Sequence, residues 1–321
     1  MGRLELVAFS DEHLEDAATL LAARLARDRA LEPLLPARYE EPAEAREELR
    51  RLWQADGASG SAALRAGRLT GYVIGAPRQP EVWGENTWVD FAGHAVEEPD
   101  LARDLYGHSA AGWVEAGSRR HYVLVPADPP LVDAWFRVGF GQQQGHGYQE
   151  IPERSDVHVP DGCEIRKPTE ADVNQLLEVD LALPRHQQSS PIFSERPLPS
   201  EDELREEWAR TLAGTEETVL IGLRDGRPVA CWGFVPAEMS RHYHGPMLPE
   251  QARYLSFAST VPEARGSGLG VALTESGLAW AASEGYSAMV TDWRVTNLLA
   301  SRFWPRRGFR TSVLRLYRSI P

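Results

Sequence analysis

The chain repeats itself once. Six local features follow one another in the same order in the first half and again in the second half. Four of the matched pairs are Gly67 and Gly226, Phe91 and Phe257, Trp113 and Trp280, and Gly139 and Gly308, which lie 159, 166, 167 and 169 residues apart. Chance similarity does not preserve such an order. The repeat therefore predicts two copies of one α/β unit.

Each copy opens with a short apolar stretch and then a helix start. Residues 7–14 and residues 165–172 both follow this pattern, and Thr169 is a good helix N-cap in the second copy. Residues 151–156 are polar and lie next to prolines, as expected of a linker. We therefore expect one domain over residues 1–152, a linker over 153–160 and a second domain over 161–321.

Composition excludes several classes of protein. No apolar run approaches the ~20 residues that a membrane helix needs, so no membrane association is expected. The net charge of −13 argues against nucleic-acid binding. The polar residues 1–14 do not fit a signal peptide, and two cysteines cannot form a disulfide framework. A cytoplasmic location is the expectation.

Two further expectations concern the source and metal binding. Lys167 is the only lysine among 34 basic residues, which is typical of GC-rich coding and points to a bacterial source. The histidines of the first half lack the spacing of metal ligands, so we expect no metal.

One segment of the second half has the sequence pattern of a phosphate-binding loop. A strand-like run covers residues 254–261, and a glycine-rich loop then leads into an apolar helix. Glycines let backbone N–H groups converge, and a helix N-terminus adds about half a positive charge. A plain strand-to-helix turn is the simpler alternative. The loop lacks the Gly-Lys-Ser/Thr of a nucleotide P-loop and the G-x-G-x-x-G spacing of a dinucleotide site.

Two ordered motifs carry a family resemblance. Arg265-x-x-Gly268-x-Gly270 resembles the acetyl-CoA signature Q/R-x-x-G-x-G/A of the GNAT superfamily of N-acetyltransferases. Downstream, residues 297–309 resemble the second landmark of that family, N-x-x-A-x-x-x-Y-x-x-x-G-F. The resemblance covers about residues 162–321, and it reaches the first half only through the repeat. It implies two tandem GNAT-like domains, each with a mixed, mostly antiparallel sheet flanked by helices.

The resemblance also implies how acetyl-CoA, as acetyl donor, is held. The loop would bind the pyrophosphate, the preceding strand would pair with the pantetheine arm, and the second motif would contribute further contacts. No metal is implied. The residues placed in these roles are Arg265, Gly266, Ser267, Gly268, Leu269 and Gly270 for the loop, Ala258 and Thr260 for the strand, and Asn297 and Trp304 for the second motif.

The catalytic groups depart from the family pattern, because Trp304 stands where the family often has a proton-donating tyrosine. An indole N–H is a donor but not a useful acid. Three alternatives follow. The thiolate can leave with little help from an acid, or Ser301 or a water molecule can donate the proton. In the third, the site binds acyl-CoA without efficient turnover. Asp292 and His244 are the candidates for the general base. A structural pairing of Asp292 with Arg294 is the alternative for that carboxylate.

Two kinds of function remain. The first is an acetyl-CoA-dependent N-acetyltransferase that acts by direct transfer to a small-molecule amine. An alternative within this enzyme class is a protein similar to mycothiol synthase, which acetylates a cysteinyl sugar. The second is a non-catalytic acyl-CoA-binding or scaffolding protein. The first half carries Glu97, Glu98 and Asp100 where the glycine-rich loop belongs, so we expect it not to bind CoA. Either a monomer or a homodimer fits the tandem repeat.

Overall fold

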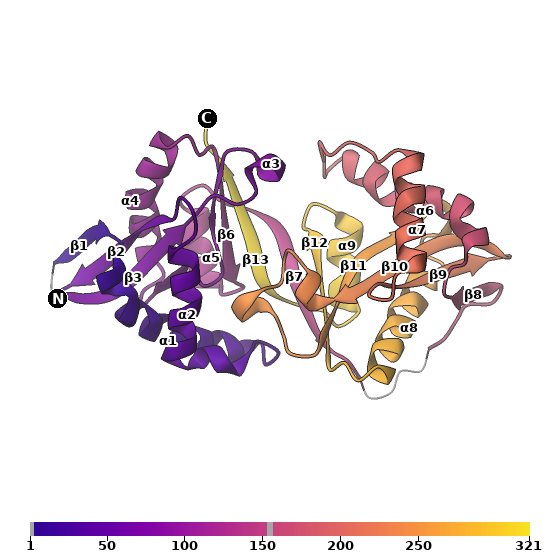
Figure 1. Ribbon diagram of the computed structural model, residues 1–321, viewed down its shortest axis with the longest axis horizontal. Coiled ribbons are helices and arrows are strands. Elements are labelled where there is room, and N and C mark those ends of the chain that lie inside the picture. Colours follow the sequence, from indigo (N-terminus) through magenta and orange to yellow (C-terminus); the bar gives the residue numbers. More distant parts are fainter. Residues whose placement is uncertain (1–2, 153–156) are drawn as a thin grey trace. The chain divides into compact units, whose positions relative to one another are not determined.

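The structure is a computed structural model, and it describes residues 3–152 and 157–321 (Figure 1). Part of the linker expected at 153–160 lies outside the described residues. The chain forms two compact units. Unit 1 contains the residues up to His146 together with Gly245–Leu248 and Thr311–Pro321. Unit 2 contains Gly147–His244 and Pro249–Arg310.

The first half of the chain alternates strands and helices. Its elements are β1 (Leu4–Ala8), α1 (Leu14–Leu31), α2 (Pro42–Trp53), β2 (Ser59–Arg65), β3 (Arg68–Gly75), α3 (Pro80–Trp83), β4 (Asn86–Val89), β5 (His94–Val96), α4 (Leu101–Glu115), β6 (Arg120–Pro126), α5 (Pro129–Phe136) and β7 (Gly141–Glu150). Helix α1 buries Leu14, Ala18, Leu21 and Leu25, which recur at the three- and four-residue spacing of one helix face.

The second half repeats this order with few changes. Its elements are β8 (Cys163–Arg166), α6 (Val173–Gln188), α7 (Glu201–Ala213), β9 (Thr218–Arg224), β10 (Arg227–Pro236), β11 (Ala252–Thr260), α8 (Leu269–Ser283), β12 (Ala288–Arg294), α9 (Leu298–Arg306) and β13 (Arg310–Ser319). The mixed α/β class predicted from the repeat is confirmed.

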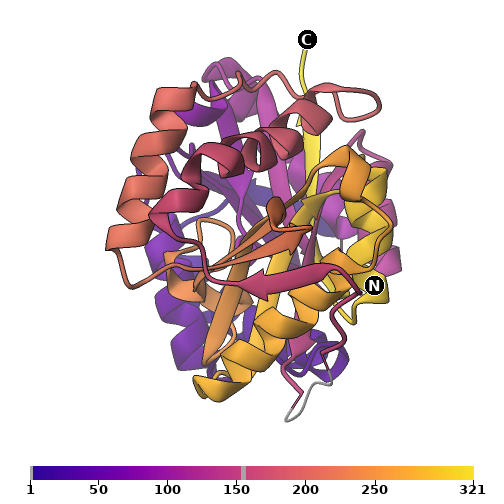
Figure 2. The ribbon, with the colours of Figure 1, turned by 90° about the vertical axis from the view of Figure 1, so that its right-hand side faces the viewer.

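Unit 2 is built on one mixed sheet. Its strands follow the order β7-β12-β11-β10-β9-β8. The pairs from β8 to β11 are antiparallel, and β11 and β12 are parallel. Helices α6 and α7 cover one face of this sheet, and α8 covers the other (Figures 1 and 2). Each face therefore has its own hydrophobic core.

Unit 1 contains two sheets. The first has the order β1-β2-β3-β5, and the second runs β4-β6-β13-β7. Helices α4 and α5 pack on a core that both sheets share, which includes Val73, Leu105, Val123 and Trp135. Helix α1 packs against α2, β3 and β5.

The last strand of the chain lies in unit 1. β13 pairs with β6 in antiparallel register, from Val313↔Pro126 to Ser319↔Arg120. Its Leu314 and Leu316 belong to the core of unit 1. The end of β7, from Gly147 onward, lies in unit 2. The compact units are therefore not continuous segments, whereas the divisions at 1–152 and 161–321 describe how the sequence repeats.

The helices of the described residues are short or polar. None of those in residues 3–152 and 157–321 combines the length and the hydropathy that a membrane-spanning helix requires.

Candidate functional site

Strand β11 is paired along one edge and open along part of the other. It pairs with β10 from Arg253 to Thr260, but with β12 only up to Tyr254↔Val290. At the point of separation, Thr291 Oγ1 donates a hydrogen bond to the Leu255 carbonyl at 2.9 Å. Over the described residues, β11 has no strand partner on this side from Leu255 onward. An open strand edge of this kind can pair with an extended, amide-containing ligand.

The backbone of β11 contains an irregularity beside this opening. The register to β10 shifts between Gly233 and Phe234, which leaves Ser256 as an extra residue. Such a bulge bends the strand and increases its twist. The sequence-predicted residues Ala258 and Thr260 lie between the bulge and the end of the strand, and both are half-buried.

The loop after β11 is shaped by two left-handed glycines. Gly266 has φ +77° and Gly268 has φ +86°, which are left-handed backbone conformations that residues other than glycine rarely adopt. Gly268 is the N-cap of the fifteen-residue helix α8, whose first turn carries no acidic residue. The first N–H groups of a helix have no partner inside it. Successive turns of opposite hand therefore aim backbone N–H groups into one concavity that suits an anion.

Three of the other loop residues support this shape. The Ser267 hydroxyl donates to the Ala264 carbonyl at 2.8 Å and lies 3.4 Å from the amide of Leu269. Arg265 Nε donates to the Thr260 carbonyl at 3.2 Å, which ties the exposed arginine to the end of β11. Gly270 lies against the rings of Trp232 and Phe303, so its lack of a side chain lets α8 approach the core closely.

The equivalent opening in unit 1 is filled by protein. Two short strands stand where one long strand would be: β4 pairs with β6, and β5 pairs with β3. His94 of β5 is fully buried, and its Nε2 lies 2.9 Å from the carbonyl oxygen of Leu124 on β6. Burial lowers the pKa of His94 to about 3, so the ring is neutral. The buried Arg24 donates to the His94 carbonyl at 3.1 Å.

The loop that follows β5 is acidic and already paired. Arg68 donates to Glu97 at 2.8 Å through Nη2, and Arg65 donates to Glu98 at 3.1 Å. The Arg68 guanidinium holds the pKa of Glu97 below its usual range. This loop therefore presents carboxylates where unit 2 presents glycines.

Asp292 is paired with a tyrosine. The hydroxyl of Tyr254 donates to Asp292 Oδ1 at 2.6 Å, across the point where β11 and β12 separate. Sequence reasoning missed Tyr254, because the register between strands 38 residues apart is not visible in the chain.

Asn297 is the N-cap of α9, shortly after the end of β12 at Arg294, and Ser301 lies in the first turn of that helix. Asn297 is a buried N-cap whose Oδ1 accepts from the amide of Ala300 at 3.2 Å. The same oxygen lies 3.2 Å from His186 Nε2, at the end of α6. Ser301 is half-buried. No sequence signal distinguished His186, since it is a single histidine in the last turn of a helix.

Trp304 belongs to the core rather than to the opening. It is 6% exposed and packs edge-on against Phe303 and Phe309 at 4.9 and 5.5 Å between ring centroids. Trp135, in the matching place of the first half, is fully buried. Neither position therefore supports a direct contact with a ligand.

His244 lies in the loop that precedes β11 and is half-buried. Its neighbour Tyr243 is fully buried and donates to the carbonyl of Thr291 on β12 at 2.6 Å. Burial raises the pKa of Tyr243 well above its usual value, so this hydroxyl stays protonated.

Carboxylates gather on the sheet face that α6 and α7 cover. Trp208 Nε1 donates to Asp180 at 2.5 Å, and Thr211 donates to Glu217 at 2.9 Å. Burial raises the pKa of Asp180 to about 7 and also raises that of Glu217. A Cβ at Gly233 would lie 2.9 Å from Glu217 Oε1 and 3.5 Å from the hydroxyl of the bulge residue Ser256. Glycine at 233 thus leaves room for a carboxylate beside the bulge.

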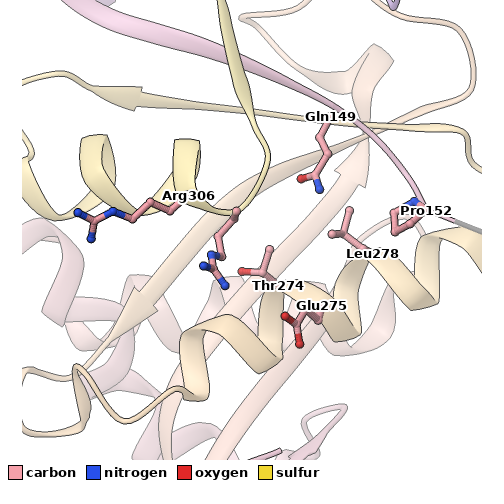
Figure 3. A pocket seen from close by; sticks show the side chains of 7 residues that line it. Gln149, Pro152, Thr274, Glu275, Leu278 and Arg306 are labelled. Carbon is pink, nitrogen blue, oxygen red and sulfur yellow. The ribbon is translucent and has the colours of Figure 1, made fainter. Parts of the chain in front are cut away.

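A separate pocket lies beside α8. It has a volume of about 320 Å³, and Thr274, Glu275 and Leu278 of α8 lie below Gln149 in it (Figure 3). Pro152, Arg306 and Arg307 complete its lining. It shares no residue with the predicted site. Within the described residues, no three His, Cys, Asp or Glu side chains converge as metal ligands would.

Comparison with known proteins finds similarity to one family of enzymes. Residues 183–309 match the family model of the acetyltransferase (GNAT) family. The fold is similar to a GCN5-related N-acetyltransferase from Sphaerobacter thermophilus, with a TM-score of 0.57 and 13% identity, over 98% of this chain and 95% of that one. No curated protein matches the sequence.

Two further structures align along almost the whole chain. A GCN5-related glucosamine N-acetyltransferase region of a fungal multi-domain β-N-acetylglucosaminidase gives a TM-score of 0.52 at 14% identity, over 99% of this chain and 38% of that one. A tandem GNAT protein from the clavulanic acid biosynthesis pathway gives 0.49 at 15% identity, over 99% and 98%. The acetyltransferase (GNAT) family model thus matches most of the second half of the chain, and the fold of the chain is similar to that of a GCN5-related N-acetyltransferase.

Proposed function

We propose that unit 2 transfers the acetyl group of acetyl-CoA to an amine of a small molecule. One observation carries the proposal. Strand β11 separates from β12 after Tyr254 and leads, open on that side, into the left-handed glycine loop at the start of α8. A strand edge suits the two amides of a pantetheine arm, and a loop of converging N–H groups suits a pyrophosphate. Both lie on one continuous path.

The contacts follow from that path. The amides of residues 265–270 would hold the pyrophosphate, and Arg265 would add a charged contact. The backbones of Ala258 and Thr260 would pair with the pantetheine arm. Asn297 would contribute its side-chain NH₂ group, because its oxygen already caps α9. In unit 1, His94 fills the corresponding opening, so we propose one acetyl-CoA site per chain.

The reaction would be direct attack of the amine nitrogen on the thioester carbonyl. The protein would contribute mainly by holding the two reactants together and by donating backbone N–H groups of β11 to the developing oxyanion. Glu217 beside the bulge, and the net charge of −13, favour a cationic amine as acceptor.

Calorimetric titration with acetyl-CoA tests the binding step. We expect about one site per chain in the wild type and no measurable binding in Gly268→Glu, because the carboxylate would enter the anion site. The matched control is Gly67→Glu. Gly67 also has a left-handed backbone, with φ +78°, but lies in a hairpin turn of the first half with open space around it. Equal loss of binding in both variants would contradict the assignment.

Release of CoA thiol in a panel of primary amines tests turnover. Thiol release that requires both amine and acetyl-CoA would support the transferase. The second candidate function, a non-catalytic acyl-CoA-binding module, is favoured by the buried Trp304 at the family's tyrosine position. Tight binding of acetyl-CoA with no thiol release from any amine would establish that alternative instead.

A further inference from the structure

Tyr254 and Asp292 lie on the two sides of the opening between β11 and β12. Tyr254 belongs to the last residue pair of the parallel strands, and Asp292 lies two residues beyond that pair on β12. Their 2.6 Å hydrogen bond therefore spans the opening just beyond the point where the strands meet. Both side chains are half-buried, so neither is sealed in the core.

An aromatic cluster fixes the tyrosine ring from one side. The ring of Tyr243 packs against that of Tyr254 with 5.7 Å between centroids, and Tyr148 packs against Tyr243 at 5.5 Å. Tyr243 is itself held by hydrogen bonds to the carbonyls of Thr291 at 2.6 Å and Gly147 at 3.2 Å. The phenol of Tyr254 is thus held in place by packing and by its bond to Asp292.

This pair lies at the far end of the proposed path for the acyl arm. The arm would start at the loop of residues 265–270 and run along β11 toward Tyr254. Its thioester is the end farthest from the pyrophosphate, so the thioester would lie where the strands converge. Trp304 cannot supply a proton there, because an indole N–H is not acidic and the ring is buried in the core.

We propose that Asp292 and Tyr254 form a proton relay from the attacking nitrogen to the leaving sulfur, a role that rests on the proposed acetyl transfer. The nitrogen lone pair forms the C–N bond, and the surplus N–H proton passes to the Asp292 carboxylate. The C–S bond then breaks, and its electron pair stays on sulfur. Protonation of Asp292 reverses its hydrogen bond with Tyr254, so that the carboxyl group donates to the phenol oxygen while the phenolic hydrogen turns toward the sulfur and moves to it. One proton crosses from nitrogen to sulfur, and Asp292 and Tyr254 return to their starting states.

The carboxyl group is what makes the phenol an adequate acid. An ordinary phenol has a pKa of about 10 and a thiol one of about 8.5, so unaided transfer to the thiolate is unfavourable by about 1.5 pKa units. A proton arriving from Asp292 prevents the phenolate from accumulating. The two residues should therefore act as one unit.

A double-mutant cycle tests this coupling with acetyl-CoA and the amine that gives the fastest thiol release. Tyr254→Phe and Asp292→Asn should each lower kcat by 100-fold or more, with the acetyl-CoA dissociation constant within about twofold of wild type. The double variant should be no more than about threefold slower than the slower single variant. Tyr286→Phe is the control, since its hydroxyl contacts Arg253 at 3.4 Å outside the opening, and it should keep wild-type kcat.

The outcomes separate the relay from the proposed function. Thermal unfolding and acetyl-CoA titration of each variant show whether it is folded and able to bind. Wild-type kcat in Tyr254→Phe, or losses that multiply in the double variant, would overturn the relay and leave acetyl transfer standing. An absence of amine-dependent thiol release in the wild type would overturn both.

Discussion

Two aspartates of the second half have pKa values shifted in opposite directions. Asp172, at the start of α6, accepts two 2.8 Å bonds from Arg166 and two more from Thr169, which hold its pKa well below its usual range. Asp180 lies two turns further along the same helix. Its pKa is raised to about 7, because it is buried and has other carboxylates nearby. One helix therefore carries one aspartate that stabilises the fold as an anion and one that destabilises it.

The sign of each contribution follows from linkage. Asp180 has a folded pKa above its unfolded value of about 3.9, so its ionisation opposes folding as pH rises from about 4 to about 7. We expect Asp180→Asn to exceed the wild type in free energy of unfolding at pH 8 by about 2 to 4 kcal/mol, with no difference near pH 4. Guanidinium unfolding at both pH values measures this.

Asp172→Asn is the matched control with the opposite sign. Its pKa is lowered, so its contribution is present above about pH 4 and is lost on acidification. We expect Asp172→Asn to be destabilised at pH 8 by about 1 to 2 kcal/mol, since it loses a helix cap and an ion pair. The reasoning fails if Asp180→Asn is the less stable variant at pH 8.

At the level of elements, a second prediction concerns the stability of glycine-to-alanine variants in two helices. A Cβ at Gly277 of α8 would lie 2.2 Å from the ring of Phe234 on β10, whereas a Cβ at Gly112 of α4 would meet nothing within 4 Å. Gly277→Ala should cost about 1 to 3 kcal/mol of stability by overpacking. Gly112→Ala should add about 0.5 to 1 kcal/mol, because alanine favours the helix.

Denaturant unfolding of the two alanine variants measures both changes under identical conditions. A neutral Gly277→Ala would mean that the Phe234 ring moves aside without cost, and that α8 does not depend on close contact with β10. The result bears on the site, because α8 carries the proposed anion loop at its first turn.

The same scale shows what a sequence can predict. The glycine loop at Gly266 and Gly268 could be found because its signal is local: a strand, small residues and a helix start. The position of His94 in the corresponding opening of unit 1 could not be predicted, because it depends on the break between β4 and β5. The Tyr254–Asp292 pair depends on strand register, which no local pattern encodes.

For the whole molecule, the repeat in the sequence and the compact units of the fold do not coincide. β13 belongs to the second copy of the repeat, but Leu314 and Leu316 pack in the core of unit 1, and the strand pairs with β6. A repeat reveals which segments are alike, whereas strand pairing decides which segments fold together. The stability of unit 1 should therefore depend on residues near the end of the chain.

Hydrogen exchange tests this dependence residue by residue. Leu316→Ala removes a fully buried side chain from the core of unit 1, which should cost about 2 to 5 kcal/mol and raise exchange in the amides of β6. Leu278→Ala makes the same change in the core of unit 2, which should raise exchange in β9 and β10. Both leucines come from the second copy of the repeat. If Leu316→Ala raised exchange in β9 and β10 while sparing β6, β13 would be stabilising the copy to which it belongs in sequence rather than the unit in which it lies.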